Sequence, residues 1–153
     1  MHLAQVNIAR LTHPAGHPAV AGFVDNLARV NELAERQPGF VWRLKGEEEL
    51  LPENKLSEDP QLIFTMSVWE NAEALEHFVY KTIHAQFYKK RHNWFEASSK
   101  PNMVLWQVEV GHHPFVPEAL ARMQDLETNG PSERAFGWAE VMDVERLRML
   151  RGA

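Results

Sequence analysis

A helical segment in the middle of the chain carries the residues best suited to acid–base chemistry. Within residues 83–97, IHAQFYKKRHNWFEA, His84 and Tyr88 are four residues apart and so share one side of a helix. Histidine is the usual general acid or base near neutral pH, and a tyrosine hydroxyl one turn away can hydrogen-bond a phenol or enolate oxygen. We therefore predict that both residues line a small-molecule pocket. The alternative is a half-exposed helix edge on which Lys89 to His92 are simply solvated.

Neighbouring residues extend this candidate site. In a helix that runs continuously from residue 72, His77, His84, Tyr88 and Phe95 fall on one stripe at spacings of seven, four and seven. A break near Thr82 would remove His77 from that stripe. The ligand-binding residues that we expect from these helices are His77, Phe78, Phe87 and Arg91.

Two predicted strands supply further polar and aromatic candidates. Asn7 lies among apolar neighbours in LAQVNIARL, and a polar side chain in such a strand needs a partner when it is buried. We expect Asn7 to orient a ligand. Trp42 and Arg43 are the next candidates to face a ligand, although Arg43 has an internal carboxylate such as Glu109 as an alternative partner.

Several classes of function find no support in the sequence. There is no cysteine, no metal-ligand spacing such as H-E-x-x-H, no glycine-rich phosphate loop and no G-x-S-x-G. A formal net charge of −5 argues against a nucleic-acid partner. No apolar run approaches the roughly 18 residues of a membrane span. We expect a cytoplasmic protein without a metal or cofactor, and His112 and His113 to lie in a loop.

The elements that must position these residues follow from hydrophobic spacing. With 153 residues, 44% hydrophobic and 24% charged, the chain fits a single domain. We predict a core over about 2–110 and a C-terminal extension over about 111–153. The elements of this core follow the order β-α-β-β-α-β, which is the ferredoxin-like α+β arrangement. Its predicted elements are strand 2–11, helix 18–36, strand 40–45, strand 61–69, two helical pieces that meet near Thr82, and strand 102–110. Alternation in strand 40–45 places Phe40, Trp42 and Leu44 on one inward face, and Asn71 is the expected cap of the first helical piece.

The extension and the longest loop carry less specific signals. We predict a helix from near Pro117, a short strand at 136–141 and a short helix at 143–150. The charged loop 46–60 is interpreted as a solvated connector, with a lid over a pocket as the alternative.

The pattern of the last core strand indicates that the chain forms an oligomer. The predicted strand 102–110, NMVLWQVEV, is apolar on both sides, whereas a sheet with helices on one face should have a polar second face. We therefore expect a homodimer that covers this face. The alternative is that the C-terminal segment covers it within one chain.

A series of segments resembles a known family. LAQVNIARL, GFVWRL, MSVWENAEALEHFVY, HAQFYKKRHNWFE, VLWQVEVGHHP and EALARMQDLETNGPSERAF are similar to an uncharacterised bacterial family, domain of unknown function 3291. The W-x-x-x-x-A-L pattern that starts at Trp69 also resembles the dimeric α+β barrel superfamily, which includes antibiotic-biosynthesis and haem-degrading monooxygenases. This resemblance implies a ferredoxin-like protomer joined to its twin across a two-fold axis, with a pocket between helices and sheet.

The resemblance frames three functional hypotheses. In the first, the chain is a cofactor-independent monooxygenase that acts on an aromatic or polyphenolic substrate, with His84 as the base and Tyr88 and Asn7 as orienting groups. In the second, the same pocket binds a small apolar or aromatic molecule without catalysis. In the third, the chain binds or degrades haem. Beside these three functions stands a fourth hypothesis, that the chain is a purely structural dimer. Asn7 matches the asparagine of the haem-degrading members, but Phe78 stands at their tryptophan position and Tyr88 at their haem-ligating histidine, so two of three positions differ.

Overall fold

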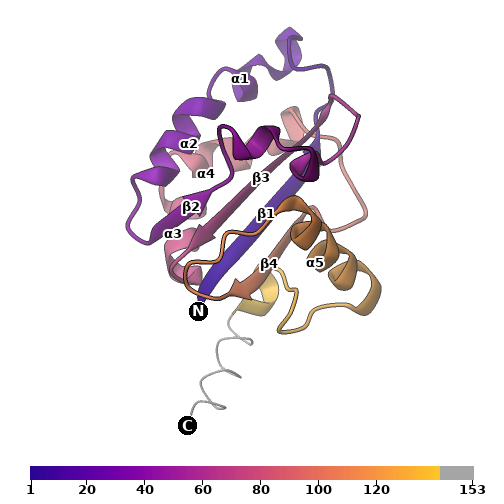
Figure 1. The fold of residues 1–153 in the computed structure, drawn as a ribbon. Coiled ribbons are helices and arrows are strands. Elements are labelled where there is room, and N and C mark those ends of the chain that lie inside the picture. Colours follow the sequence, from indigo (N-terminus) through magenta and orange to yellow (C-terminus); the bar gives the residue numbers. More distant parts are fainter. Residues whose placement is uncertain (142–153) are drawn as a thin grey trace.

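The centre of the computed structural model, which describes residues 1–141, is a four-stranded antiparallel sheet. Its strand order is β2-β3-β1-β4, the order that a ferredoxin-like β-α-β-β-α-β chain produces (Figure 1). The predicted α+β, ferredoxin-like protomer is therefore confirmed. The strands are β1 (His2–Arg10), β2 (Phe40–Arg43), β3 (Leu62–Trp69) and β4 (Met103–Val108).

Helices lie on both sides of this sheet. The α-helices are α1 (Ala21–Val24), α2 (Leu27–Glu35), α3 (Ala72–Lys81), α4 (His84–Lys89) and α5 (Val116–Asn129). Short 3-10 turns are η1 (Pro18–Val20), η2 (Glu48–Leu50), η3 (Pro52–Asn54), η4 (Arg91–Asn93) and η5 (Trp138–Glu140). Figure 1 shows α2, α3 and α4 on one side, which we call the helical face, and η2, η3 and α5 on the other, the α5 face.

Each face of the sheet buries its own apolar cluster. On the helical face, Leu3, Trp69 and Leu105 pack against α2 and α3. On the α5 face, Val6, Val68 and Trp106 pack with residues of α5. Strand β4 therefore contributes to both clusters, and its predicted two-sided apolar character is confirmed.

The predicted helix over 18–36 is interrupted. α1 ends at Val24 and α2 begins at Leu27. At the break, the side-chain amide of Asn26 donates a hydrogen bond to the carbonyl oxygen of Gly22 at 2.9 Å. Asparagine competes in this way with backbone hydrogen bonding, which weakens a helix interior. Apolar spacing alone did not reveal this competition.

The break predicted between the two later helices is present. Asn71 caps the start of α3, because its side-chain oxygen accepts a hydrogen bond from the amide of Ala74 at 2.8 Å. At the other end, the Thr82 hydroxyl donates to the carbonyl of Phe78 at 2.6 Å and accepts from the amide of His84 at 3.2 Å. The helix is therefore discontinuous, and the stripe that would include His77 is not formed.

Strand β2 departs from the strict alternation predicted for residues 40–45. Phe40 pairs with Trp69 while Trp42 pairs with Val68, so Val41 is an extra residue in the strand. Such a bulge moves the following side chains to the other face. Phe40 consequently packs on the helical face, whereas Trp42 packs on the α5 face. The prediction that both share one face is wrong for this reason.

Loop 46–60 is partly docked rather than simply solvated. Asn54 is buried; its side chain accepts a hydrogen bond from the amide of Val116 at 2.9 Å and donates to the carbonyl of Glu48 at 2.8 Å. The loop is thereby attached to the start of α5, the helix predicted from near Pro117. Together they cover part of the α5 face within one chain.

The C-terminal extension also differs from its prediction in one element. In place of a strand over 136–141, Phe136 makes a single bridge to Leu105, and the turn η5 follows. The predicted helix 143–150 lies outside the described residues.

Candidate functional site

Two polar side chains are exposed at the middle of the helical face. Asn7 of β1 and Thr65 of β3 are directly opposite one another in the antiparallel ladder. Both are exposed, although β1 and β3 are the two central strands. They belong to the same face as Leu3 and Trp69, because side chains two apart along a strand point the same way. The helical layer therefore leaves the sheet open at this point.

The next cross-strand pair along the same face, Gln5 and Ser67, belongs to a hydrogen-bond network. The Gln5 side-chain amide donates to the Ser67 hydroxyl at 2.7 Å, and the Trp69 indole Nε1 donates to the same oxygen at 2.9 Å. Ser67 is itself buried. Two donors to one hydroxyl fix its position, so the inner boundary of the open region is rigid and polar.

An aromatic stack connects this network to α4. The Trp69 and Phe78 rings are stacked with centroids 5.4 Å apart, and the Phe78 and His84 rings lie 4.8 Å apart. Phe78 is buried within this stack. Consequently it supports His84 rather than offering a free ring to a ligand.

The protonation of His84 is set by its surroundings. Its Nδ1 lies 3.2 Å from the carbonyl oxygen of Val79, and since a carbonyl only accepts, Nδ1 is the protonated nitrogen. Burial lowers the pKa of His84 below its ordinary value, and the Val79 hydrogen bond opposes that change. The ring is therefore neutral at pH 7, with Nε2 carrying the lone pair.

Tyr88 has a different environment from His84. Its ring packs edge-on against Tyr80 at 5.5 Å, and the Arg91 guanidinium lies 4.1 Å from its centroid. Arg91 also donates to the Tyr88 carbonyl at 2.8 Å. Tyr80 in turn packs against Trp138. Tyr88 and Arg91 thus form an aromatic cluster with the C-terminal extension.

The remaining predicted site residues are dispersed. Trp42 is on the α5 face and stacks on His113 at 4.7 Å. Arg43 donates to Glu35 at 2.6 Å, so its partner is Glu35 and not the suggested Glu109.

On the helical side, the other two candidates are also separate. His77 is exposed on α3. The half-buried Phe87 packs near Trp94 at 6.0 Å. Among the predicted residues, Asn7 lies at the open region, and Phe78 and His84 are linked to it through Trp69 and Ser67.

Sequence reasoning missed Thr65, Ser67 and Gln5. Their signal is the alternation in 61–69, where Thr65 and Ser67 interrupt the apolar series on the same side as Ile63 and Trp69. A polar pair on a face that must receive helices indicates a site when the helices leave it uncovered.

No metal or membrane feature accompanies this region. Within residues 1–141, no group of three or more His, Cys, Asp or Glu side chains is arranged to hold a metal ion. In the same part of the chain, no helix combines the length and the apolar character that crossing a bilayer requires.

The fold and the open polar centre define a ferredoxin-like α+β protein with an uncovered region between sheet and helices. The chain belongs to the family described as Domain of unknown function (DUF3291), whose model matches residues 2–151. The expected family membership is confirmed. A comparison with curated proteins gives no match.

Solved structures with similar folds have low identity to the chain. SnoaB, a cofactor-independent oxygenase from Streptomyces nogalater, is 15% identical over 71% of this chain and 93% of its own, with a TM-score of 0.47. A Nitrosomonas europaea protein of unknown function is 16% identical, with coverages of 74% and 94% and a TM-score of 0.49. A proposed antibiotic biosynthesis monooxygenase from Chloroflexus aurantiacus J-10-fl is 16% identical, with coverages of 75% and 99% and a TM-score of 0.46.

Proposed function

We propose that the chain binds a small aromatic molecule between the sheet and the helical layer. The observation that carries this proposal is the exposure of Asn7 and Thr65 at the centre of the helical face. Apolar surroundings with a few convergent polar groups are typical of small-molecule sites. Here an amide and a hydroxyl can hydrogen-bond an oxygen of the ligand, and the ring of His84, which Phe78 supports, is proposed as its aromatic boundary.

His84, which is linked to this region through Phe78 and Trp69, is the proposed base for catalysis. Neutral His84 can accept a proton at Nε2, and its Val79 hydrogen bond holds the tautomer that keeps this lone pair free. The substrate class that fits is an anthrone or quinol, whose anion reacts directly with O2. For an anthrone, a CH2 group becomes C=O, one oxygen atom enters the product and the other leaves as water. The substrate supplies all four electrons, so the proposed monooxygenase reaction needs no further reductant.

Oxygen uptake tests the catalytic proposal. We expect wild-type protein to consume O2 with anthrones or quinols and His84→Gln to reduce the rate by about 10²-fold or more, the usual contribution of a general base. His92→Gln is the matched control, because His92 is exposed on η4. Tyr88→Phe tests the orienting role expected for the Tyr88 hydroxyl. Uptake that is unchanged in His84→Gln would contradict the assignment of the base.

Ligand binding tests the site without reference to catalysis. Asn7→Leu and Thr65→Val remove the polar groups of the open region, and we expect each to weaken binding of an anthrone by roughly tenfold, or about 1.4 kcal/mol. Tryptophan fluorescence provides the readout, since Trp69 belongs to the adjoining network. Binding that needs these residues but gives no oxygen uptake would support the non-catalytic hypothesis. Anthrone binding that is unchanged in both Asn7→Leu and Thr65→Val would contradict the proposed site.

The packing of the residues at the haem positions argues against a haem site. Phe78 is packed between Trp69 and His84, and the half-buried Tyr88 ring contacts Tyr80 and Arg91. We derive no haem chemistry from them. A Soret band that appears on haem titration and disappears in Tyr88→Phe or His84→Ala would overturn this conclusion.

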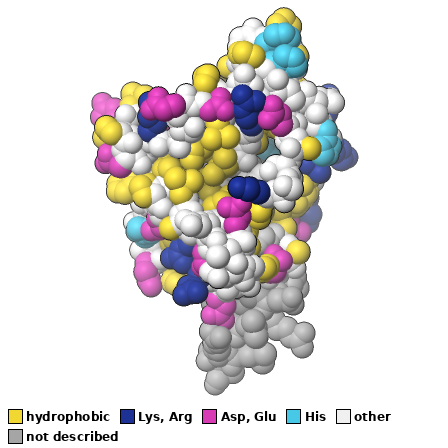
Figure 2. Space-filling model, turned by 90° about the vertical axis from the view of Figure 1, so that its right-hand side faces the viewer, with side chains coloured by type: hydrophobic (Ala, Val, Ile, Leu, Met, Phe, Trp, Pro, Cys, Tyr) yellow, Lys and Arg dark blue, Asp and Glu magenta, His cyan; other side chains and the backbone are white. Residues whose placement is uncertain are grey.

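We also propose a homodimer formed through the α5 face. Large apolar side chains are exposed beside η3 and α5, namely Leu50, Leu51, Phe115 and Leu120. Ile8 and Phe64 of the central strands are only partly buried on the same face. Figure 2 shows hydrophobic side chains gathered on the side of the molecule that carries α5. Contiguous exposed apolar surface commonly marks a protein interface, and symmetric dimers are the commonest soluble assemblies.

A further inference from the structure

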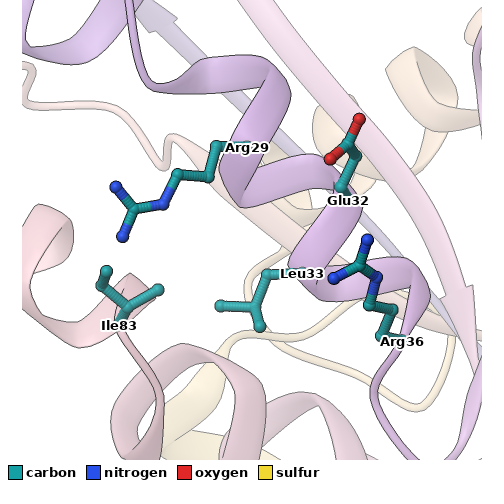
Figure 3. A pocket seen from close by; sticks show the side chains of 5 residues that line it. All are labelled: Arg29, Glu32, Leu33, Arg36 and Ile83. Atoms are coloured by element: carbon teal, nitrogen blue, oxygen red, sulfur yellow. The ribbon is translucent and has the colours of Figure 1, made fainter.

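A hollow lies between α2 and the connection from α3 to α4. It has a volume of about 300 Å³ and is lined by Arg29, Glu32, Leu33, Arg36 and Ile83. Figure 3 shows Leu33 and Ile83 on opposite sides of the gap, with Arg29 extending over Ile83. This volume is at the lower end of the range for small-molecule sites.

Helical spacing brings the lining residues of α2 together. Arg29, Leu33 and Arg36 follow one another at steps of four and three, so they share one side of the helix. Leu33 is half-buried and joins the periphery of the helical-face core. The hollow therefore has an apolar centre, Leu33 with Ile83, between two guanidinium groups.

The two arginines have no carboxylate partner among residues 1–141. Neither Arg29 nor Arg36 forms an ion pair there. Glu35, the neighbouring carboxylate of α2, is bound by Arg43 and Lys45 instead. Glu32 extends away from Ile83 in Figure 3. Two cations and one carboxylate give the hollow a formal charge of +1.

We propose that this hollow binds a carboxylate with an apolar body. Guanidinium groups bind carboxylates through paired, charge-assisted hydrogen bonds. The apolar body of the ligand lies on Leu33 and Ile83 at the centre of the hollow, and its carboxylate lies at the rim, where Arg29 and Arg36 supply the positive charge. This site shares no residue with the proposed Asn7–His84 site, so it adds a second ligand to the molecule.

Calorimetric titration with 2-naphthoate tests this site. Wild-type protein is expected to bind 2-naphthoate, and the neutral 2-naphthamide at least about tenfold more weakly, since the amide lacks the charge that guanidinium recognises. Arg29→Met and Arg36→Met keep side-chain length but remove the charge, and each weakens naphthoate binding by about fivefold to tenfold. The control is Arg122→Met on α5, which leaves the affinity unchanged.

Three results would overturn the proposal: no naphthoate binding by wild-type protein, equal affinity for acid and amide, or unchanged affinity in both arginine variants. Thermal unfolding of each variant establishes that it is folded, and Arg29→Lys, which keeps a charge, should retain part of the affinity. The outcome is separate from that of the proposed function. His84→Gln should leave naphthoate binding intact while it reduces oxygen uptake.

Discussion

Nδ1 of His84 lies 3.2 Å from the carbonyl oxygen of Val79, five residues earlier in the chain. The contact spans the junction at which α3 ends and α4 begins, so the break at Thr82 is what brings the imidazole back toward the preceding helix. Because the contact fixes the tautomer, the proposed base is prepared by backbone geometry before any substrate binds. Its ionisation then depends mainly on burial.

The first prediction concerns the titration of His84. Burial disfavours the imidazolium, so NMR titration should give a pKa below the ordinary value of 6.5. Between the folded and unfolded pKa values, the unfolded chain binds more protons, and stability therefore rises with pH. The contribution of neutral, buried His84 to the free energy of unfolding is fully present above pH 6.5. It is lost as the pH falls toward the pKa of His84 in the folded protein.

Urea unfolding of wild type and His84→Gln at several pH values checks this linkage. Relative to the variant, wild type should lose stability as the pH falls below 6.5. If the difference in unfolding free energy between wild type and His84→Gln is constant with pH, or grows in favour of wild type in acid, burial does not determine the pKa of His84.

The second prediction concerns a buried indole on the α5 face. Trp106 is fully buried, and its Nε1 donates to Oε2 of Glu118 at 2.9 Å, while Oε1 of Glu118 contacts His112 at 2.7 Å. Glu118→Leu leaves the indole N–H without an acceptor and should lower the free energy of unfolding by about 1–3 kcal/mol. Glu118→Gln keeps an acceptor and should cost less. Chemical denaturation measures both, with the exposed Gln124→Ala as the control; equal losses for Leu and Gln would refute the role of the acceptor.

The sequence predicted most of the fold because its signals are local and repeated. Alternation located β1, β3 and β4, and the capping residue Asn71 located the start of α3. The faces within β2 were not predictable in this way, because one bulged residue, Val41, reverses the alternation and depends on pairing with β3.

The site was predicted only in part for a related reason. His84 and Asn7 were selected by their chemistry, which sequence displays directly. Their setting depends on which faces pack together: Thr65 matters only because helices leave it uncovered, and Trp42 is on the opposite face from Asn7. Such tertiary relations are not encoded in the spacing of any one segment.

The third prediction compares two glycines with positive φ. Gly39 has φ of 83°, and a Cβ placed there would lie 2.5 Å from the Cβ of Ala74; Gly46 has φ of 65° and nothing within 4 Å. Gly46→Ala should therefore cost about 1–2 kcal/mol from backbone conformation alone. Gly39→Ala adds a steric conflict with α3 and should cost roughly 2–5 kcal/mol. Thermal unfolding of the two variants provides the comparison, and equal losses would mean that α3 moves aside without cost.

The fourth prediction tests the proposed homodimer at α5. Leu120 is 39% exposed and Phe115 is 46% exposed, beside the part of the sheet that α5 and loop 46–60 leave partly covered. A stable dimer needs about 800 Å² of buried surface from each copy, and a charge at its centre would be left without a partner. Leu120→Glu and Phe115→Glu should therefore shift the protein to monomers in sedimentation velocity. Val110→Glu, at a side chain that is 68% exposed outside α5, serves as the control. A wild-type protein that sediments as a monomer at micromolar concentration would contradict the dimer, and the apolar surface beside α5 would then require a different partner.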